Sequence, residues 1–229
     1  YDLDSNKFYE SDKEWSTTSG SYHTKVSMGF ANYYSITKDK KYLKLANLIC
    51  KNSLKYQQKD GRFVSFFSKG GTNIHPHCYS AEGLWSIGMF TNNINFLNKS
   101  LKALKWIINK TNSIGKPPRL YKDGKPIYNE RIDIIAQTIR LNFLQNIAMR
   151  KNFMKKPTLL KMFKILEKFQ ITKNNDIKTF GSFIWGKTST GELVNHSNSW
   201  VTFFCIQCLE LAKSIKFNKN YKMDPFDLV

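Results

Sequence analysis

The sequence predicts an all-α protein, an incomplete α/α toroid of repeated helical hairpins with short β-hairpin connectors on one rim. Three observations lead to this fold class: a weak internal repeat, two alternating types of helical segment, and turn signals between them. The chain has 229 residues, 41% of them hydrophobic, which is enough for one substantial core. We expect an extended segment over residues 1–20, the toroid domain over 21–215 and a tail over 216–229.

The repeat has a period of about 54 residues. The segment from Tyr22 to Leu43 aligns with the segment from Pro76 to Leu97 and places His23 on His77. Weaker matches follow in the same order further along the chain. A period of this length is typical of stacked supersecondary units.

Two types of helix alternate along the chain. The first type is apolar on most sides, as a helix enclosed by neighbours must be, and is expected at 22–36, 77–90, 131–148 and 198–213. The second type is amphipathic and is expected at 40–58, 94–110 and 157–170. In the first of these, Tyr42, Leu45 and Ile49 recur at helical spacing opposite lysines. Such alternation builds one ring of helices inside another.

A turn signal follows each amphipathic helix: Asp60-Gly61, Asp123-Gly124 and Thr190-Gly191. These dipeptides lie near short β-prone runs and predict hairpins. We expect the connectors on one rim with the N-termini of the enclosed helices, whose free amides favour anions. Seven helices make three and a half hairpins, so we expect a closed ring to need residues outside this chain, which begins at Tyr1 rather than Met.

The chain is strongly basic, with 36 Lys and Arg against 17 Asp and Glu and a net charge of +19. Only five of the basic residues are Arg, the type preferred for bidentate contacts with carboxylate or phosphate. The charge is therefore either a general surface background or a dedicated patch, and both attract polyanions. We expect a polyanion as partner, either an acidic polysaccharide or oligosaccharide or a nucleic acid. No membrane span is predicted, since no run reaches about 18 apolar residues. Compartment and oligomeric state stay open.

The first polar cluster leads into the second enclosed helix. His75, His77, Tyr79 and Glu82 are predicted catalytic residues, because imidazole and phenol exchange protons near neutral pH and a carboxylate can orient an imidazole. Pro76 in the first turn would place His75 just outside the helix and His77 at its mouth. The alternative is a capping cluster whose histidines bond to the backbone. We predict no metal and no cofactor.

The second cluster is a polar stripe on the third enclosed helix. Asp133, Gln137 and Arg140 share one face, so they either line a wet cavity or satisfy one another. Asp133 is a catalytic candidate, while Arg131 at the rim and Gln137 are substrate-binding candidates and Arg140 a structural partner. The alternative is a buried ion-pair network without a ligand.

The third cluster precedes the last enclosed helix. His196 is a catalytic candidate at the predicted rim, and Asn198 is a substrate-binding candidate or an N-cap. Trp185 and Trp200 flank it, and their flat faces suit sugar rings, although core packing is the commoner use of Trp.

The order of these features resembles that of α/α-toroid carbohydrate-active enzymes. This superfamily includes unsaturated glucuronyl hydrolases, N-acylglucosamine epimerases, polysaccharide lyases and the helical domains of glucuronyl 5-epimerases. The resemblance is carried by the Tyr34 to Ala46 segment, the Asp60-Gly61-Arg62-Phe63 turn and the Trp200 to Leu211 helix. It implies a sugar site at the rim of inner-helix N-termini.

Together with the basic charge, the resemblance predicts a lyase or epimerase that acts on a uronate. Arg131 would neutralise the substrate carboxylate while a His or Tyr removes the neighbouring proton. One alternative is a glycoside hydrolase that uses Glu82 and Asp133. Another is a non-catalytic helical module that binds polyanions.

Overall fold

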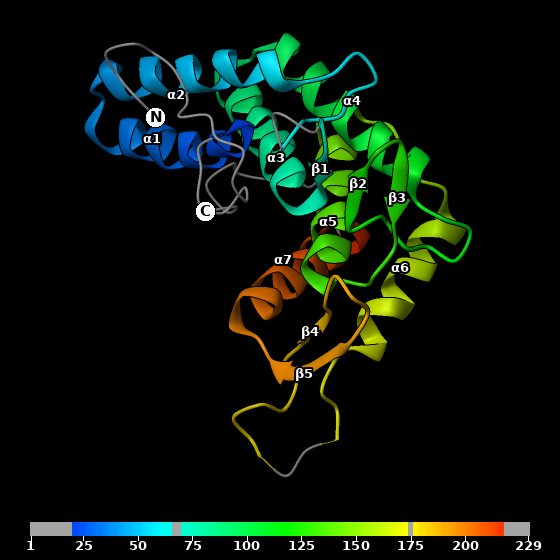
Figure 1. The fold of residues 1–229 in the computed structure, drawn as a ribbon. Coiled ribbons are helices and arrows are strands. Elements are labelled where there is room, and N and C mark those ends of the chain that lie inside the picture. Colours follow the sequence, from blue (N-terminus) through cyan, green and yellow to red (C-terminus); the bar gives the residue numbers. More distant parts are fainter. Residues whose placement is uncertain (1–19, 66–69, 174–175, 218–229) are drawn as a thin grey trace. The chain divides into compact units, whose positions relative to one another are not determined.

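The computed structural model describes residues 20–65, 70–173 and 176–217. Within these residues the fold consists of helices joined by short strands (Figure 1). The α-helices are α1 (Thr24–Thr37), α2 (Lys40–Ser53), α3 (Ile74–Thr91), α4 (Ile94–Lys110), α5 (Ile132–Met149), α6 (Lys156–Lys168) and α7 (Ser199–Phe217). The strands are β1 (Thr72–Asn73), β2 (Leu120–Lys122), β3 (Lys125–Ile127), β4 (Ile184–Lys187) and β5 (Leu193–Ser197). Short 3-10 helices, η2 (Ser21–His23) and η3 (Leu54–Tyr56), flank the first hairpin.

The chain divides into two compact units. The described part of the first unit runs from Gly20 to Trp106 and includes Leu120–Lys125; there α1 packs on α2 and on α3, and β1 pairs antiparallel with β2. The second unit holds Ile107–Arg119 and the described residues from Pro126 onward; there α5 packs on α6 and α7, and β4 pairs with β5. Each unit is therefore built on helical hairpins.

The 54-residue repeat has a physical basis in how its helices stop and start. Lys38 and Asn92 end α1 and α3 in the left-handed conformation, with φ of 58° and 54°, which terminates the helical hydrogen bonds. The next residue caps the following helix: the side chain of Asp39 accepts from the Lys41 N–H at 3.0 Å, and that of Asn93 accepts from the Asn95 N–H at 3.1 Å. The same stop-and-cap pair thus recurs in both hairpins.

The enclosed character predicted for four helices is confirmed for α3 and α5 and is wrong for α1 and α7, where apolar side chains such as Ile36 and Phe203 are exposed. All residues of α3 from Ile74 to Gly88 are buried except Tyr79, and all residues of α5 from Ile132 to Gln145 are buried. In contrast, α2 and α6 bury only one side each. The four cysteines, at 50, 78, 205 and 208, are free and buried. Across the described residues, no helix has the length and apolar character that crossing a bilayer requires.

Two of the predicted connectors are hairpins with defined turn chemistry. Asp123 and Gly124 have φ of 51° and 75°, the two positive values of a type I′ turn. The β4–β5 hairpin pairs Ile184 with Ser197 and Gly186 with Val194 and has a bulge between these pairs. The bulge sets one residue of β4 against two of β5.

Two predicted boundaries need correction. Helix α3 begins at Ile74 rather than 77, because the side chain of Asn73 caps it by accepting from the His75 N–H at 3.2 Å. His75 therefore lies inside the helix and not before it. Helix α7 continues to Phe217, so the predicted start of the tail at 216 falls within this helix. Apart from Gly20, the predicted extended segment 1–20 lies outside the described residues, as does the tail beyond 217.

Candidate functional site

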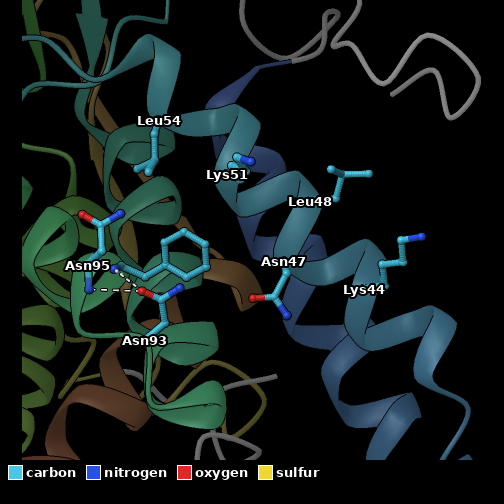
Figure 2. A pocket seen from close by; sticks show the side chains of 8 residues that line it. Lys44, Asn47, Leu48, Lys51, Leu54, Asn93 and Asn95 are labelled. Carbon is cyan, nitrogen blue, oxygen red and sulfur yellow. Dashed lines mark hydrogen bonds between the residues drawn. The ribbon is translucent and has the colours of Figure 1, made fainter.

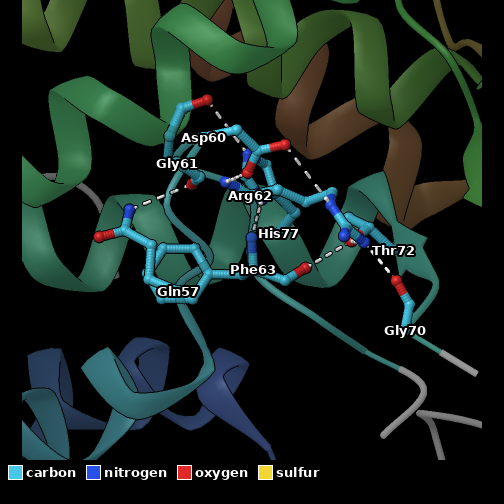
Figure 3. A network of polar contacts seen from close by, with 9 residues as sticks. Gln57, Asp60, Gly61, Arg62, Phe63, Gly70, Thr72 and His77 are labelled. Atoms are coloured by element: carbon cyan, nitrogen blue, oxygen red, sulfur yellow. Dashed lines mark hydrogen bonds and ion pairs between the residues drawn. The ribbon is translucent and has the colours of Figure 1, made fainter. Parts of the chain in front are cut away.

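Two backbone groups hold His77 in the first unit, and Figure 3 shows the contact with Phe63. The N–H of Phe63 donates to Nδ1 at 3.1 Å, and Nε2 lies 3.2 Å from the carbonyl oxygen of Ala103. The two contacts together require a neutral ring with its proton on Nε2. Burial lowers the pKa of His77 to about 4. Both ring nitrogens therefore bond to the backbone, which agrees with the alternative prediction of a histidine that serves the fold.

Arg62 and its neighbours form a structural network beside His77 (Figure 3). The Arg62 guanidinium donates to the Gly70 carbonyl and, at 3.2 Å, to the Thr72 hydroxyl, which in turn donates to the Phe63 carbonyl at 2.7 Å. Gly61 has a φ of 105°, and a Cβ there would lie 2.4 Å from the Lys102 carbonyl oxygen. The Asp60-Gly61-Arg62-Phe63 turn is thus explained by packing within the unit.

A second group of ionisable side chains in the first unit surrounds Tyr79. His75 is 2% exposed, and its ring centroid lies 4.4 Å from that of Tyr79, which is partly exposed. Lys25 of α1 places its ammonium 5.9 Å from the centre of the Tyr79 ring and 2.5 Å from the Glu82 carboxylate. Lys25 was not among the predicted site residues, although it is the only charged residue of α1. An imidazole, a phenol, an ammonium and a carboxylate are therefore grouped in this part of the first unit, with Lys25 and Glu82 in direct polar contact.

The second unit brings together three of the predicted site residues. Arg131, the N-cap residue of α5, donates from Nε to Oδ1 and from Nη2 to Oδ2 of Asp133, both at 2.9 Å. The guanidinium also lies 4.3 Å from the centre of the Trp185 ring. Arg131 is 8% exposed and Asp133 fully buried, while Trp185 is partly exposed. The result is a fixed cation against an aromatic face.

Strand β4 holds Trp185 against Arg131 through its backbone. Gly186 forms an isolated bridge with Arg131, and the N–H of Lys187 donates to the Glu130 carbonyl at 2.6 Å. Gly186 has a φ of 108°, and a Cβ there would lie 2.4 Å from the Glu130 carbonyl oxygen. Only glycine allows β4 to approach the start of α5 so closely.

Arg119 is a further basic residue of this cluster, and it was not predicted as a site residue. Its Nη1 donates to the carbonyl of Lys187, directly after the residue that pairs with Arg131. Burial lowers the pKa of Arg119, the charge of Arg131 lowers it further, and the charge of Asp133 opposes this. The sequence alone could have drawn attention to Arg119, because it is one of only five arginines and directly precedes a predicted hairpin.

The remaining polar stripe of α5 has structural partners. Arg140 is 1% exposed, donates to the side chain of Gln207, and lies 4.8 Å from the centre of the Phe204 ring. This agrees with the structural role predicted for Arg140. Gln137, a predicted substrate-binding residue, is buried on the same helix with 1% exposure.

The residues of the third cluster lie at the surface of the second unit. Asn198 caps α7, since its side chain accepts from the Val201 N–H at 3.0 Å. His196 is exposed on β5, where the bulge sets it and Asn195 opposite Trp185. Trp200 is 50% exposed and can offer its ring to a ligand.

A hollow of about 560 Å³ lies elsewhere in the first unit (Figure 2). Lys44, Asn47 and Lys51 of α2 line one side, and Asn93 and Phe96 at the start of α4 line the other. The amide of Asn47 donates to a carbonyl of its own helix, and Asn93 caps α4. None of the predicted site residues lines this hollow. Within the described ranges, no group of three or more His, Cys, Asp or Glu residues is arranged to hold a metal ion.

Comparison with known proteins gives matches in structure alone. No family model and no curated protein matches the sequence. A D-mannose isomerase superposes with a TM-score of 0.66 and 14% identity over 89% of this chain and 58% of its own. An unsaturated glucuronyl hydrolase from Bacillus sp. GL1 superposes with a TM-score of 0.64 and 11% identity, over 85% of this chain and 59% of its own. A polysaccharide lyase superposes with a TM-score of 0.64 and 13% identity, over 85% of this chain and 61% of its own.

These similarities define the fold class. The chain has the fold of the α/α-toroid carbohydrate-active enzymes, as the sequence predicted. It spans about 60% of the length of the structures that it matches.

Proposed function

We propose that the chain acts on an acidic, uronate-containing polysaccharide or oligosaccharide by removing the proton next to the carboxylate, as a lyase or an epimerase. The observation that carries this proposal is the packing of the fixed Arg131 guanidinium against the Trp185 indole. A uronate has a carboxylate that a guanidinium binds and a sugar ring that an indole covers. The net charge of +19 supports an acidic substrate.

The carboxylate has to be neutralised before the adjacent C–H bond becomes acidic enough to break. A fixed cation beside the carboxylate stabilises the negative charge that develops there as the proton leaves. We assign this role to Arg131. Asp133 then holds the guanidinium in place instead of acting as an acid or a base, because both of its oxygens accept from Arg131.

We assign the proton acceptor to His196, which is exposed on β5 in the same unit as Arg131. His75 and Tyr79 of the first unit are separate candidates for proton transfer. In a lyase the acceptor takes the proton, the released electron pair forms a double bond, and the donor protonates the leaving oxygen. In an epimerase the donor returns a proton to the opposite face of the same carbon.

The hydrolase alternative has less support. It needs one carboxyl group as an acid and a second as a base or nucleophile. Glu82 is ion-paired with Lys25, and Asp133 with Arg131. Trp200 and Asn198 are proposed to contact the sugar in both the hydrolase and the lyase or epimerase. The experiment below tests the alternative of a non-catalytic module that binds polyanions.

The test is solvent-proton exchange with a panel of uronate polymers in D₂O. Deuterium at the carbon next to the carboxylate, or new absorbance from an unsaturated sugar, supports the proposal, and a neutral glucan is the control substrate. Arg131→Lys is expected to abolish both signals, and so is at least one of His75→Gln, Tyr79→Phe and His196→Gln. Absence of both signals across the panel, with polymer binding that weakens steeply in salt and survives all four variants, would assign the chain to the binding modules instead.

A further inference from the structure

We infer that Arg119 and Arg131 act as a pair that binds one carboxylate, with Asp133 occupying one edge of Arg131 and leaving its end for the ligand. The inference deepens the proposed function, and the identity of the ligand as a uronate rests on that proposal. Arg119 becomes a substrate-binding residue, and Asp133 a positioning residue.

Asp133 leaves one end of the Arg131 guanidinium for a ligand. A guanidinium has five N–H donors in a planar fork. Asp133 takes donors on Nε and Nη2, each at 2.9 Å. The remaining N–H donors, two on Nη1 and one on Nη2, point away from the carboxylate of Asp133. A ligand therefore meets Arg131 end-on, and its second contact has to come from another residue.

Arg119 is in position to supply that second contact. Strand β4 binds both arginines through consecutive residues, because Gly186 pairs with the backbone of Arg131 and the carbonyl of Lys187 accepts from Nη1 of Arg119. The backbone of Arg119 is fixed as well, since its N–H donates to the Ile127 carbonyl at 2.7 Å. One strand thus holds the Arg119 guanidinium and the backbone of Arg131, whose own guanidinium is fixed by Asp133.

The charges around the two arginines do not balance. Lys116 and Lys187 both pair with the Glu130 carboxylate, and Arg131 pairs with Asp133. Together with Arg119, the cluster holds four cations and two carboxylates, an excess of two positive charges. The lowered pKa of Arg119 is consistent with that excess, since the charge of Arg131 contributes to it after burial. A bound carboxylate would offset part of the excess.

Trp185 favours a uronate over an inorganic anion. Its ring is partly exposed beside Arg131 and offers apolar area to a sugar ring. Sulfate would gain the charge contacts but not this area. We therefore expect D-glucuronate to bind more tightly than sulfate and D-glucose to bind least.

The experiment is a calorimetric titration of the full chain with D-glucuronate, D-glucose and sodium sulfate at low ionic strength. Arg119→Gln is the test variant. Arg150→Gln is the matched control, because it removes the same charge from an exposed arginine of the same unit. Arg150 lies at the C-terminal end of α5, and Arg131 lies at the N-terminal end. Loss of a charge-assisted hydrogen bond predicts that Arg119→Gln weakens glucuronate binding about 10- to 100-fold. The control variant should stay within about twofold, as only long-range charge changes.

The outcomes separate this inference from the proposed function. Equal glucuronate affinity in Arg119→Gln and Arg150→Gln overturns the inference, whatever the turnover. Selective loss in Arg119→Gln supports it, even when no polymer of the panel is turned over. Sulfate that binds as tightly as glucuronate overturns the choice of a uronate. If Arg119→Gln does not fold, Arg119→Lys keeps the charge without the planar fork, and unchanged affinity in that variant also counts against the pair.

Discussion

His77 and Ala103 are joined by a buried hydrogen bond, in which Nε2 of the imidazole donates to the carbonyl oxygen at 3.2 Å. The bond ties α3 to α4 inside the first unit. Because the N–H of Phe63 already donates to Nδ1, the ring cannot take a second proton without losing that contact. His77 therefore stabilises the folded state in its neutral form only.

This arrangement predicts how stability depends on pH. The folded-state pKa of His77 is about 4, against an ordinary value of 6.5 for histidine. Between these values the unfolded chain binds the proton and the folded chain does not, so the free energy of unfolding falls as the pH drops from 6.5 toward 4. The loss is about 3 kcal/mol. Urea unfolding at several pH values measures it.

The control for this prediction is His77→Gln. Glutamine keeps a donor and an acceptor but does not titrate, so the variant should be less stable at pH 7 and should lose less stability on acidification. The charges of Asp60 and Arg62 also act on His77, and both remain in the variant. Parallel stability curves for the two proteins would contradict the assignment.

The Arg131–Asp133 pair is expected to stabilise the second unit. In Asp133→Asn, the buried guanidinium loses its counter-charge, which typically costs about 3–5 kcal/mol. Glu210→Gln is the matched control, because Glu210 and Lys213 are about two-thirds exposed and 4.0 Å apart. Such a surface pair contributes about 0–1 kcal/mol. Equal urea midpoints for the two variants would show that the buried pair is not needed for folding.

The contact between α1 and α3 depends on Gly83. A Cβ at Gly83 would lie 2.2 Å from the carbonyl oxygen of Thr24, and a backbone atom cannot move aside without shifting the helix. Gly83→Ala should therefore destabilise the fold by about 1–3 kcal/mol or more. Gly29→Ala on α1 has open space around the new methyl group and should stabilise by up to about 1 kcal/mol. Thermal unfolding of both variants checks the opposite signs.

The cysteines are expected to be unreactive in the folded protein. Burial raises the pKa of Cys50 and of Cys208 to about 12 and also raises that of Cys205. At pH 8 a thiol with that pKa is about one part in ten thousand thiolate. Iodoacetamide should modify these residues slowly in native buffer and rapidly above the urea midpoint. Fast native modification of Cys205 would mean that α7 opens readily.

Local features of the sequence were sufficient to predict the helices. The Asp123-Gly124 turn and the apolar periodicity act within a few residues, so the order of residues alone reveals them. The sequence was also sufficient to predict that Arg131 lies near Asp133, because the two residues are only two positions apart. The common rim of the connectors stays a prediction.

The sequence by itself determined the all-α toroid architecture, the order of the helices, and the residue types available for chemistry. The tertiary structure decided what each side chain does. His77 bonds to Ala103, which lies 26 residues away, and Arg119 reaches a carbonyl 68 residues away on β4. Periodicity fixes which face of a helix is buried, but the partner of a buried polar group depends on which distant segment packs against that face. For this reason the sequence alone could not show that His77 bonds to two backbone groups or that Arg119 reaches β4.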